Sequence, residues 1–336
     1  MVTLVFSHET SAYYHEYFDI KDQGAWMGKL PNSTLLRDMS LPGTHETMAR
    51  FGGDIPTCQT LSLNQLLRAG VRVFDIRCRC INQRWSIYHG PVYQFSSFDG
   101  VLWTVIDYLE FNPTETVLMR VKEEYEAENC QGDFKTQFEL IYWTHQDYSE
   151  YFWHPGTDNP TLGEVRKKII VLYNFSTDKN YGLSYPRFAD IQDDYMMDTN
   201  YDLYKKWNAV KNQLIKANSN ETRDTFYMNY LSASGGSFPY FVASGHSDSR
   251  TDGTRLWTGL TTIFGLNKNI YPDFPRILFG IYFEGTNILA FEWIKNNQPC
   301  FVGIVMVDFI GDGLIEQIIL RNTHCSKNNQ TSSLQT

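Results

Sequence analysis

The stretch Leu41-Pro42-Gly43-Thr44-His45-Glu46-Thr47 ends an apolar run with a histidine and a carboxylate side by side. Two later stretches have the same form, an apolar strand followed by ionisable residues: Phe74-Asp75-Ile76-Arg77-Cys78-Arg79 and Ile87-Tyr88-His89-Gly90-Pro91. Two histidines and an arginine at strand ends can supply a general base, a general acid and a cation that binds an anion. This set of groups predicts cleavage of a phosphodiester without a metal.

Strands and helices are expected to alternate along most of the chain. The expected strands are 35–45, 71–80, 116–121, 168–173, 226–231 and 301–307, with a hairpin that leads from the second strand to residue 89. The expected helices are 62–70, 97–111, 133–151, 202–217 and 288–295. This rhythm indicates a parallel sheet, and the length favours a closed or nearly closed barrel over an open doubly wound sheet. We therefore predict an α/β protein with a single domain, a distorted (β/α)8 TIM-like barrel.

The two ends of the chain differ in composition from its middle. Residues 1–25 are polar and aromatic without a clear period, which suggests an arm packed over the bottom of the barrel. The catalytic barrel is expected to comprise residues 26–321, and residues 322–336 form an irregular polar C-terminal tail. The aromatic stretch 238–241 falls in a long loop, where it serves either as a rim that faces a membrane or as core packing.

Composition and charge exclude several classes of protein. The 336 residues carry a net charge of −9 at pH 7, which argues against a nucleic-acid binder. No apolar run is long enough to span a bilayer. The six cysteines lack the spacing of a zinc site, so free thiols or one or two disulfides are expected. Three Asn-x-Ser/Thr triplets fit a secreted chain but leave the compartment open.

Barrel enzymes carry their chemistry at the carboxyl ends of the strands. His45, Arg77, Lys122 and Asp308 all fall at such ends. Because histidine titrates near neutral pH, one ring can wait neutral as a base and another charged as an acid. A guanidinium offers paired donors to two phosphate oxygens. These strand-end residues are therefore expected to meet at one mouth of the barrel.

Five stretches, taken together and in order, resemble a known family. They are Trp26-Met27, Ser40-Leu41-Pro42-Gly43-Thr44-His45, Ala69-Gly70-Val71-Arg72-Val73-Phe74-Asp75-Ile76-Arg77, Tyr88-His89-Gly90-Pro91 and Asn112-Pro113-Thr114-Glu115-Thr116. They resemble the catalytic X domain of phosphatidylinositol-specific phospholipase C, in its compact bacterial form rather than its calcium-dependent multidomain form. The resemblance runs from about residue 26 to residue 308. It implies a distorted barrel that cleaves phosphatidylinositol into diacylglycerol and a cyclic inositol phosphate, with no cofactor and no metal.

The resemblance also implies a role for each residue that matches a family motif. His45 is expected to be the general base, and Asp308 the carboxylate that orients it. His89 is expected to protonate the departing oxygen, helped by Glu46 where the family usually has Asp. Arg77 is expected to bind the phosphate, at a position where calcium-dependent relatives have a calcium ligand.

Four residues match positions of the family's inositol pocket: Lys122, Asp193, Tyr195 and Asn174. Asn174 departs from the bacterial pattern, which has an arginine here that binds the inositol ring, so the headgroup preference need not be the bacterial one. The implied partner is a membrane surface that contains phosphatidylinositol, bound peripherally by a monomer with no protein or nucleic-acid partner. The apolar residues available for insertion after the first strand are few: Met48, Phe51 and Ile55.

Two other interpretations fit the same residues. A binding module could keep the barrel and recognise phosphoinositide or glycosyl-phosphatidylinositol headgroups with little turnover, and Asn174 is its best support. A metal-dependent phosphodiesterase of another barrel family could use Glu46, Asp75 and Glu123 as ligands. Loss of activity on chelation separates the metal-dependent enzyme from the metal-free one.

Overall fold

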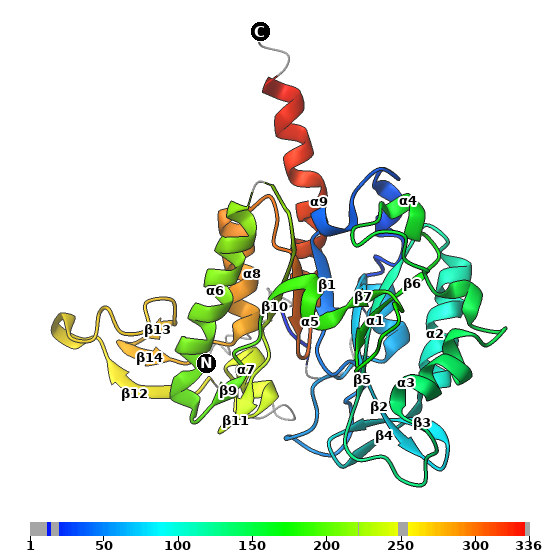
Figure 1. The fold of residues 1–336 in the computed structure, drawn as a ribbon. Coiled ribbons are helices and arrows are strands. Elements are labelled where there is room, and N and C mark those ends of the chain that lie inside the picture. Colours follow the sequence, from blue (N-terminus) through cyan, green and yellow to red (C-terminus); the bar gives the residue numbers. More distant parts are fainter. Residues whose placement is uncertain (1–11, 15–19, 221, 248–254, 333–336) are drawn as a thin grey trace.

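The computed structural model describes residues 12–14, 20–220, 222–247 and 255–332, with the side chains of these residues except 264 and 324–332. Its main sheet follows a path of parallel strands in the order β7-β6-β5-β2-β1-β15-β10-β8. These strands are β1 (Leu41–Thr44), β2 (Val73–Ile81), β5 (Val117–Glu123), β6 (Ile169–Asn174), β7 (Leu183–Ser184), β8 (Ala189–Gln192), β10 (Phe226–Tyr230) and β15 (Ile304–Val307). The curled sheet with helices outside it confirms the predicted distorted (β/α)8 TIM-like barrel in a single domain (Figure 1). Among the described residues β7 and β8 do not pair, so the barrel is open between them.

Alternate residues of each strand face the barrel interior, because side chains on a strand alternate between its two faces. The interior is filled by one apolar cluster, which includes Leu41, Val73, Leu118, Ile170, Leu172, Met228, Ile304 and Met306. Their sequence neighbours, such as Phe74 and Met119, pack in a second cluster with the helices. Gly43 lets the strands approach closely, since a Cβ there would lie 3.0 Å from the Cβ of Val73 and closer still to the sulfur of Met306.

Helices cover the outside of the sheet, with α6 and α8 on one side and α2 on the other (Figure 1). The helices are α1 (Leu63–Ala69), α2 (Phe98–Phe111), α3 (Phe134–Gln137), α4 (Leu162–Val165), α5 (Tyr185–Phe188), α6 (Leu203–Ser219), α7 (Pro239–Ser244), α8 (Thr286–Asn297) and α9 (Asp312–Ser332). The predicted helix at 62–70 is confirmed as α1, and the residues expected to start and end it do so. Ser62 and Gln65 form a capping box at its start, and Gly70 ends it with a left-handed φ of 110°.

The remaining strands form attachments to the barrel. The antiparallel pair β3 (Arg84–His89) and β4 (Val92–Ser97) extends from β2, which confirms the predicted hairpin to His89. The short strands β9 (Met196–Met197) and β11 (Ser234–Gly235) pair with each other. A separate sheet of β12 (Trp257–Thr261), β13 (Arg276–Ile277) and β14 (Gly280–Tyr282) is inserted between α7 and α8 and was not predicted.

Three predictions about local structure need correction. The expected helix at 133–151 is broken into α3, a π-helical segment Phe138–Trp143 and a 3-10 turn Ser149–Tyr151. The expected irregular tail begins inside α9, whose backbone stays helical to Ser332. The stretch 238–241 is not a loop throughout, because α7 begins at Pro239. Of its two expected roles, core packing applies to Tyr240 and Phe241, which are buried, while Phe238 is half exposed.

The described part of the N-terminal arm does not lie only at the bottom of the barrel. Tyr13 forms a β-bridge with Ile310, and the N–H of Tyr14 donates to the Phe309 carbonyl at 2.9 Å. These contacts lie just after β15, at the carboxyl ends of the strands, so the prediction is wrong for these residues. Gln23, farther along, does contact the amino end through the carbonyl of Arg68. The rest of the arm at 1–11 and 15–19 lies outside the described residues.

The cysteines adopt both of the expected states. Cys80 at the end of β2 forms a disulfide with Cys130 in the segment after β5. Cys58 and Cys78 are buried free thiols. Within the described part of the chain, no helix has both the length and the apolar character needed to cross a bilayer.

Candidate active site

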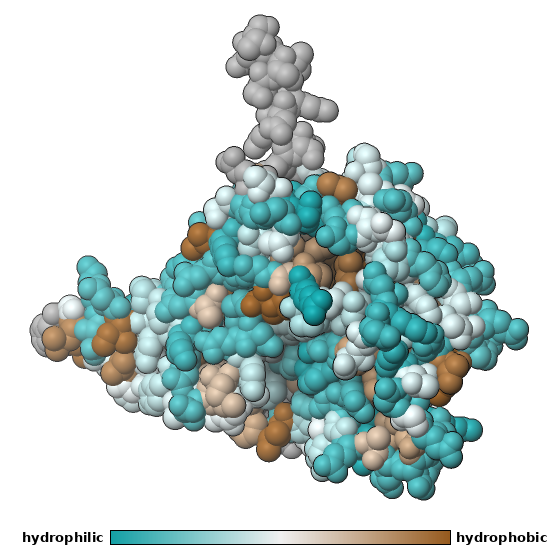
Figure 2. Space-filling view, viewed as in Figure 1, coloured by the Kyte–Doolittle hydropathy of each residue, from teal (hydrophilic) through white to brown (hydrophobic). Residues whose placement is uncertain are grey.

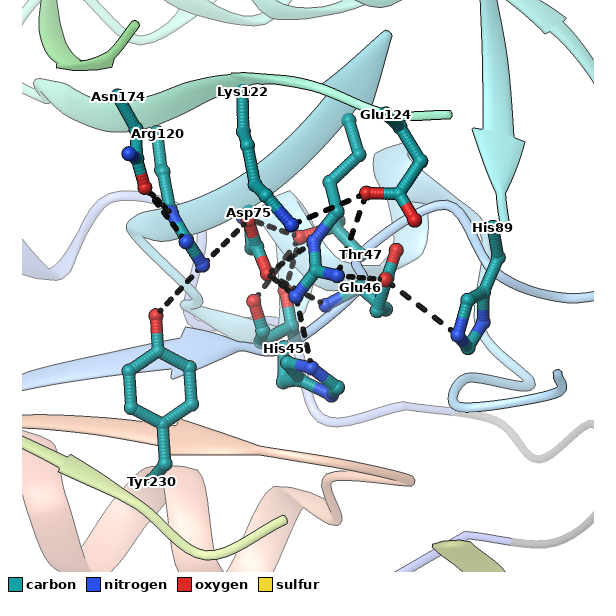
Figure 3. Close-up of polar contacts among 12 residues, drawn as sticks. His45, Glu46, Thr47, Asp75, His89, Arg120, Lys122, Glu124, Asn174 and Tyr230 are labelled. Carbon is teal, nitrogen blue, oxygen red and sulfur yellow. Dashed lines mark hydrogen bonds and ion pairs between the residues drawn. The ribbon is translucent and has the colours of Figure 1, made fainter. Parts of the chain in front are cut away.

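The strand-end residues meet in one cavity of about 800 Å³. On each strand every second side chain faces the barrel interior, and this alternation continues beyond the apolar residues to the carboxyl end. The ends of four strands, β1, β2, β5 and β15, thereby place one residue each on the cavity wall: His45, Arg77, Lys122 and Asp308. The prediction that these residues share one barrel mouth is confirmed by their position. Figure 3 labels His45 and Lys122 of this group.

His45 is held by a carboxylate and faces a guanidinium. Its Nδ1 lies 2.9 Å from Oδ1 of Asp308, and its Nε2 lies 3.1 Å from Nη2 of Arg77. Since a guanidinium only donates, Nε2 is the acceptor of a neutral ring and Nδ1–H donates to Asp308. Burial disfavours the charged ring, but the charge and hydrogen bond of Asp308 outweigh burial, and the pKa of His45 is raised.

The Arg77 guanidinium is fixed by three carboxylates. Its Nη2 and Nε donate to Oδ2 of Asp75 at 3.0 and 3.2 Å. Its Nη1 forms an ion pair with Glu46 and lies 3.6 Å from Oε2 of Glu124. These partners orient the planar group so that it borders His45 along one edge and Glu46 along another.

His89 approaches the carboxylate of Glu46 from the side opposite to His45. Its Nδ1 donates to the Pro56 carbonyl at 2.8 Å, which turns Nε2 to within 3.6 Å of Oε1 of Glu46. Figure 3 shows His45 and His89 on opposite sides of Glu46. Glu46 has a left-handed φ of 42°, and its N–H donates to Asp75 at 3.2 Å. Burial raises the pKa of Glu46, although Arg77 and His89 oppose the rise.

Three of the four residues expected in the inositol pocket line the cavity. They are Lys122, Asp193 and Tyr195. Lys122 donates to Oε2 of Glu124 at 3.3 Å, and Tyr195 is half exposed. Asn174, the fourth, is not on the cavity wall. The structure places it behind a different residue, Arg120.

Arg120 lines the cavity and was missed by the sequence prediction. Its Nη1 donates to Asp75 and to the Tyr230 hydroxyl, both at 3.3 Å, and its guanidinium lies 4.0 Å from the ring centre of Tyr185. Its Nε and Nη2 donate to Oδ1 of Asn174 at 3.0 and 2.7 Å. Despite burial, the guanidiniums of Arg120 and Arg77 hold the pKa of Asp75 far below its usual range. Arg120 sits two residues before Lys122, a spacing that places both on one strand face.

One group of potential metal ligands lies in the cavity. A nitrogen of His45, the sulfur of Cys58 and a carboxylate oxygen of Asp308 lie within 4.8 Å of one another. Burial, with the charges of Asp308 and Glu46, raises the pKa of the Cys58 thiol well above its ordinary value. The set expected for a metal-dependent enzyme is not assembled, because Glu46 and Asp75 both bind Arg77 and Glu123 does not line the cavity.

A parallel barrel whose mouth holds two imidazoles, a guanidinium and orienting carboxylates defines a class, the barrel phosphodiesterases that use acid–base catalysis. The family model of the phosphatidylinositol-specific phospholipase C X domain matches residues 50–174. A 1-phosphatidylinositol phosphodiesterase of Staphylococcus aureus is 31% identical over 246 residues, which cover 63% of this chain and 76% of the relative. The chain belongs to the phosphatidylinositol-specific phospholipase C X-domain family. The segment matched by the family model contains Arg77 and His89, whereas His45 and Asp308 lie outside it.

Other comparisons agree on the fold. A 1-phosphatidylinositol phosphodiesterase of Listeria monocytogenes is 37% identical over 190 residues, covering 51% of this chain and only 57% of the relative. The crystal structure of a phosphatidylinositol-specific phospholipase C from S. aureus superposes with a TM-score of 0.67 at 23% identity, covering 90% of this chain and 98% of that one. The L. monocytogenes enzyme gives 0.62 at 24% identity, covering 90% and 100%. A further S. aureus structure, concerned with modulation of that enzyme's membrane binding, gives 0.68 at 24% identity and covers 90% and 98%.

Proposed function

We propose that the protein cleaves phosphatidylinositol into diacylglycerol and inositol 1,2-cyclic phosphate. One observation carries the proposal: the Arg77 guanidinium lies between two imidazoles. It is 3.1 Å from Nε2 of His45 and pairs with Glu46, which is 3.6 Å from Nε2 of His89. A phosphate bound by Arg77 therefore has a base on one side and an acid on the other. All of these residues lie within 26–321, the proposed catalytic barrel.

His45 acts as the base in this proposal. Before substrate binds, Nε2 accepts a hydrogen bond from Arg77. A phosphate oxygen that takes over this N–H frees Nε2 to accept the proton of the inositol 2-hydroxyl. The hydroxyl oxygen then attacks phosphorus, while Asp308 stabilises the imidazolium that forms. Because nucleophile and phosphate belong to the same molecule, the enzyme supplies proton transfer and charge stabilisation rather than a second substrate.

His89 completes the reaction as the acid. As the bond between phosphorus and the diacylglycerol oxygen breaks, that oxygen takes the proton from Nε2 of His89. Oε1 of Glu46 lies 3.6 Å from Nε2 and, with the Pro56 carbonyl at Nδ1, orients the ring for this transfer. The protons therefore balance, with one taken by His45 and one given by His89.

Arg120 is proposed to bind the inositol ring together with Lys122, Asp193 and Tyr195. Four hydrogen bonds from Arg120 to neighbouring side chains leave one N–H of Nη2 without a partner among the described residues. This N–H is available to a ring hydroxyl because Arg120 lines the cavity. Asn174 is a positioning residue in this arrangement, since it holds Arg120 and does not line the cavity. We propose that the protein acts as a monomer that binds its membrane peripherally, with no protein partner.

The roles of His45 as base and His89 as acid can be distinguished by comparing two substrates with different leaving groups. On phosphatidylinositol, His45→Ala and His89→Ala are each expected to lower kcat by ~10²–10⁴-fold. On a nitrophenyl inositol phosphate, His89→Ala should recover most activity, because nitrophenolate leaves without a proton, whereas His45→Ala should not. His145→Ala, an exposed histidine, serves as the control. Equal losses on both substrates would contradict the assignment, and vesicle binding without any product would favour the headgroup-binding module.

A further inference from the structure

The hairpin between β13 and β14 has an unusual connection. Arg276 pairs with Ile281 and Ile277 with Gly280, so only Leu278 and Phe279 connect the two strands. Their φ values are 49° and 70°, the left-handed backbone of a two-residue turn that strongly favours Asn-Gly. Leu278 is nevertheless 93% exposed and Phe279 66% exposed. The fold holds two large apolar side chains in a disfavoured backbone conformation where they bury little surface against the protein.

Other exposed apolar residues surround this turn. We call the group the apolar tip, and it consists of Trp257, Ile263, Leu266, Ile277, Leu278 and Phe279. The N–H of Thr262 donates to the Phe279 carbonyl at 2.8 Å, which joins the segment before Ile263 to the turn. Figure 2 shows apolar side chains gathered at the outer end of this projection. Contiguous exposed apolar surface of this kind marks an interaction site.

The described segment 256–282, which carries the apolar tip, has one more positive than negative side chain, although the whole chain carries −9. Among the described residues 256–282 the charged side chains are Lys268, Asp273 and Arg276. Asp273 is neutralised by Lys211 at 3.1 Å. The Arg276 guanidinium donates to five backbone carbonyls, and neither it nor Lys268 has a carboxylate within ion-pair distance among the described residues. Two uncompensated cations beside exposed apolar side chains complement an anionic lipid surface.

The small sheet is fixed to the wall of the cavity. Phe283, just after β14, packs against Phe241 of α7 with ring centres 5.3 Å apart. Phe238, which precedes α7, and Pro239, its first residue, line the cavity. In Figure 1 the sheet projects sideways from the barrel, beside β9 and α7. A membrane that holds the tip is therefore coupled through α7 to the cavity where the lipid headgroup is cut.

We propose that the apolar tip is a membrane anchor, which inserts Leu278 and Phe279 into the interface of an anionic bilayer while Lys268 contacts the headgroups and the charge of Arg276 attracts them. This inference rests on the proposed function for the presence of a lipid surface. The anchor is not one of the two membrane-facing segments that the sequence suggested, because neither the segment after β1 nor the stretch 238–241 contributes to it. The strained turn has a direct use in this arrangement, because it presents both side chains at the outermost point of the hairpin.

The decisive variant is Leu278→Asn with Phe279→Gly. It removes the apolar side chains and supplies the preferred dipeptide, so the melting temperature should stay equal or rise. The matched control is Leu140→Asn with Phe111→Asn, a leucine and a phenylalanine that are 67% and 87% exposed on the far side of the barrel. Binding is measured by co-sedimentation with vesicles of phosphatidylcholine and phosphatidylserine, which contain no substrate. We expect the tip variant to bind about tenfold more weakly or worse, and the control to bind like wild type.

Activity gives a second readout on the same proteins. The tip variant should lose cleavage of phosphatidylinositol in vesicles and keep hydrolysis of soluble inositol cyclic phosphate. Unchanged vesicle binding, an equal loss in the control, or an equal loss on the soluble substrate would each overturn the anchor. The anchor would also be overturned if wild type were a dimer, the tip variant were a monomer, and both bound vesicles equally well. The tip would then contact a second copy of the chain. Wild type that binds vesicles through the tip but forms no inositol phosphate would instead overturn the proposed function alone.

Discussion

Asn174 holds the guanidinium of Arg120 through a single oxygen, which accepts Nε–H at 3.0 Å and Nη2–H at 2.7 Å. The two residues lie on neighbouring parallel strands, and only Arg120 reaches the cavity. A guanidinium thus lines the proposed headgroup pocket even though the sequence has an amide at 174. The arginine that the resemblance implies at position 174 of β6 is absent, but Arg120 on the neighbouring strand β5 supplies a guanidinium to the same cavity.

Arg120→Lys is expected to raise the KM for phosphatidylinositol about tenfold with a smaller change in kcat. The lysine keeps a charge near Asp75 but loses the planar fork. Asn174→Ala should shift KM in the same direction and add little to Arg120→Lys, because both act through one group. Steady-state kinetics on the single and double variants measure this, with the exposed Arg187→Lys as control. Additive effects, or a fall in kcat alone, would show that Arg120 does not bind the headgroup.

Asp308→Asn is expected to move the acid limb of kcat/KM to lower pH. Asp308 raises the pKa of His45 against the effect of burial, and a base works only when deprotonated. The wild-type limb should therefore lie above the ordinary histidine value of about 6.5. Removing the carboxylate lowers that pKa and also lowers the maximal rate, by ~10²–10⁴-fold, since the imidazolium loses its partner. A pH–rate profile that keeps its acid limb in place would contradict this role, and the exposed Asp147→Asn is the control.

Arg77→Lys is expected to lower kcat by about 10²–10³-fold on phosphatidylinositol. The substitution keeps the charge but removes the second N–H that reaches a phosphate oxygen. Arg79→Lys changes the next arginine of β2, which binds the Glu126 carbonyl and Glu128 outside the cavity, and should have little effect. If the two variants had equal activity, Arg77 would not contact the phosphate.

Asp75→Asn is expected to lower the free energy of unfolding by about 3–5 kcal/mol. Asp75 is buried between Arg77 and Arg120, and its loss leaves two guanidiniums without their shared carboxylate. Because its folded pKa is depressed, the stabilisation is present above the unfolded carboxyl pKa of about 4 and shrinks as pH falls below it. Denaturant unfolding at neutral and acidic pH measures the difference. Glu110→Gln breaks an exposed ion pair with Lys167 and should change little; a similarly small effect of Asp75→Asn would refute the claim.

Much of the barrel could be predicted from the spacing of apolar residues and from composition. The strands at 168–173 and 301–307 are continuous apolar runs, which parallel strands buried on both faces require. The polar ends of the strands expected at 35–45, 71–80 and 301–307 pointed to His45, Arg77 and Asp308, because parallel strands bring their carboxyl ends to one edge. The same period of two, counted back from Lys122, would have placed Arg120 on the inward face.

Other features depend on contacts that a single sequence does not reveal. The strand β8 is short and alternates weakly, and it becomes a strand only by pairing with β10. The sheet of β12 to β14 has a turn of Leu278 and Phe279 in place of the residues that normally signal a hairpin. The π-helical segment at 138–143 keeps a helical pattern in sequence, so its wider turns cannot be distinguished from an α-helix.

The most direct test of the two-imidazole mechanism is analysis of the products from phosphatidylinositol vesicles by phosphorus NMR, with a chelator present. We predict that inositol 1,2-cyclic phosphate and diacylglycerol appear first and at the same rate with and without the chelator. Activity that disappears on chelation, or an acyclic phosphate as the first product, would contradict the account.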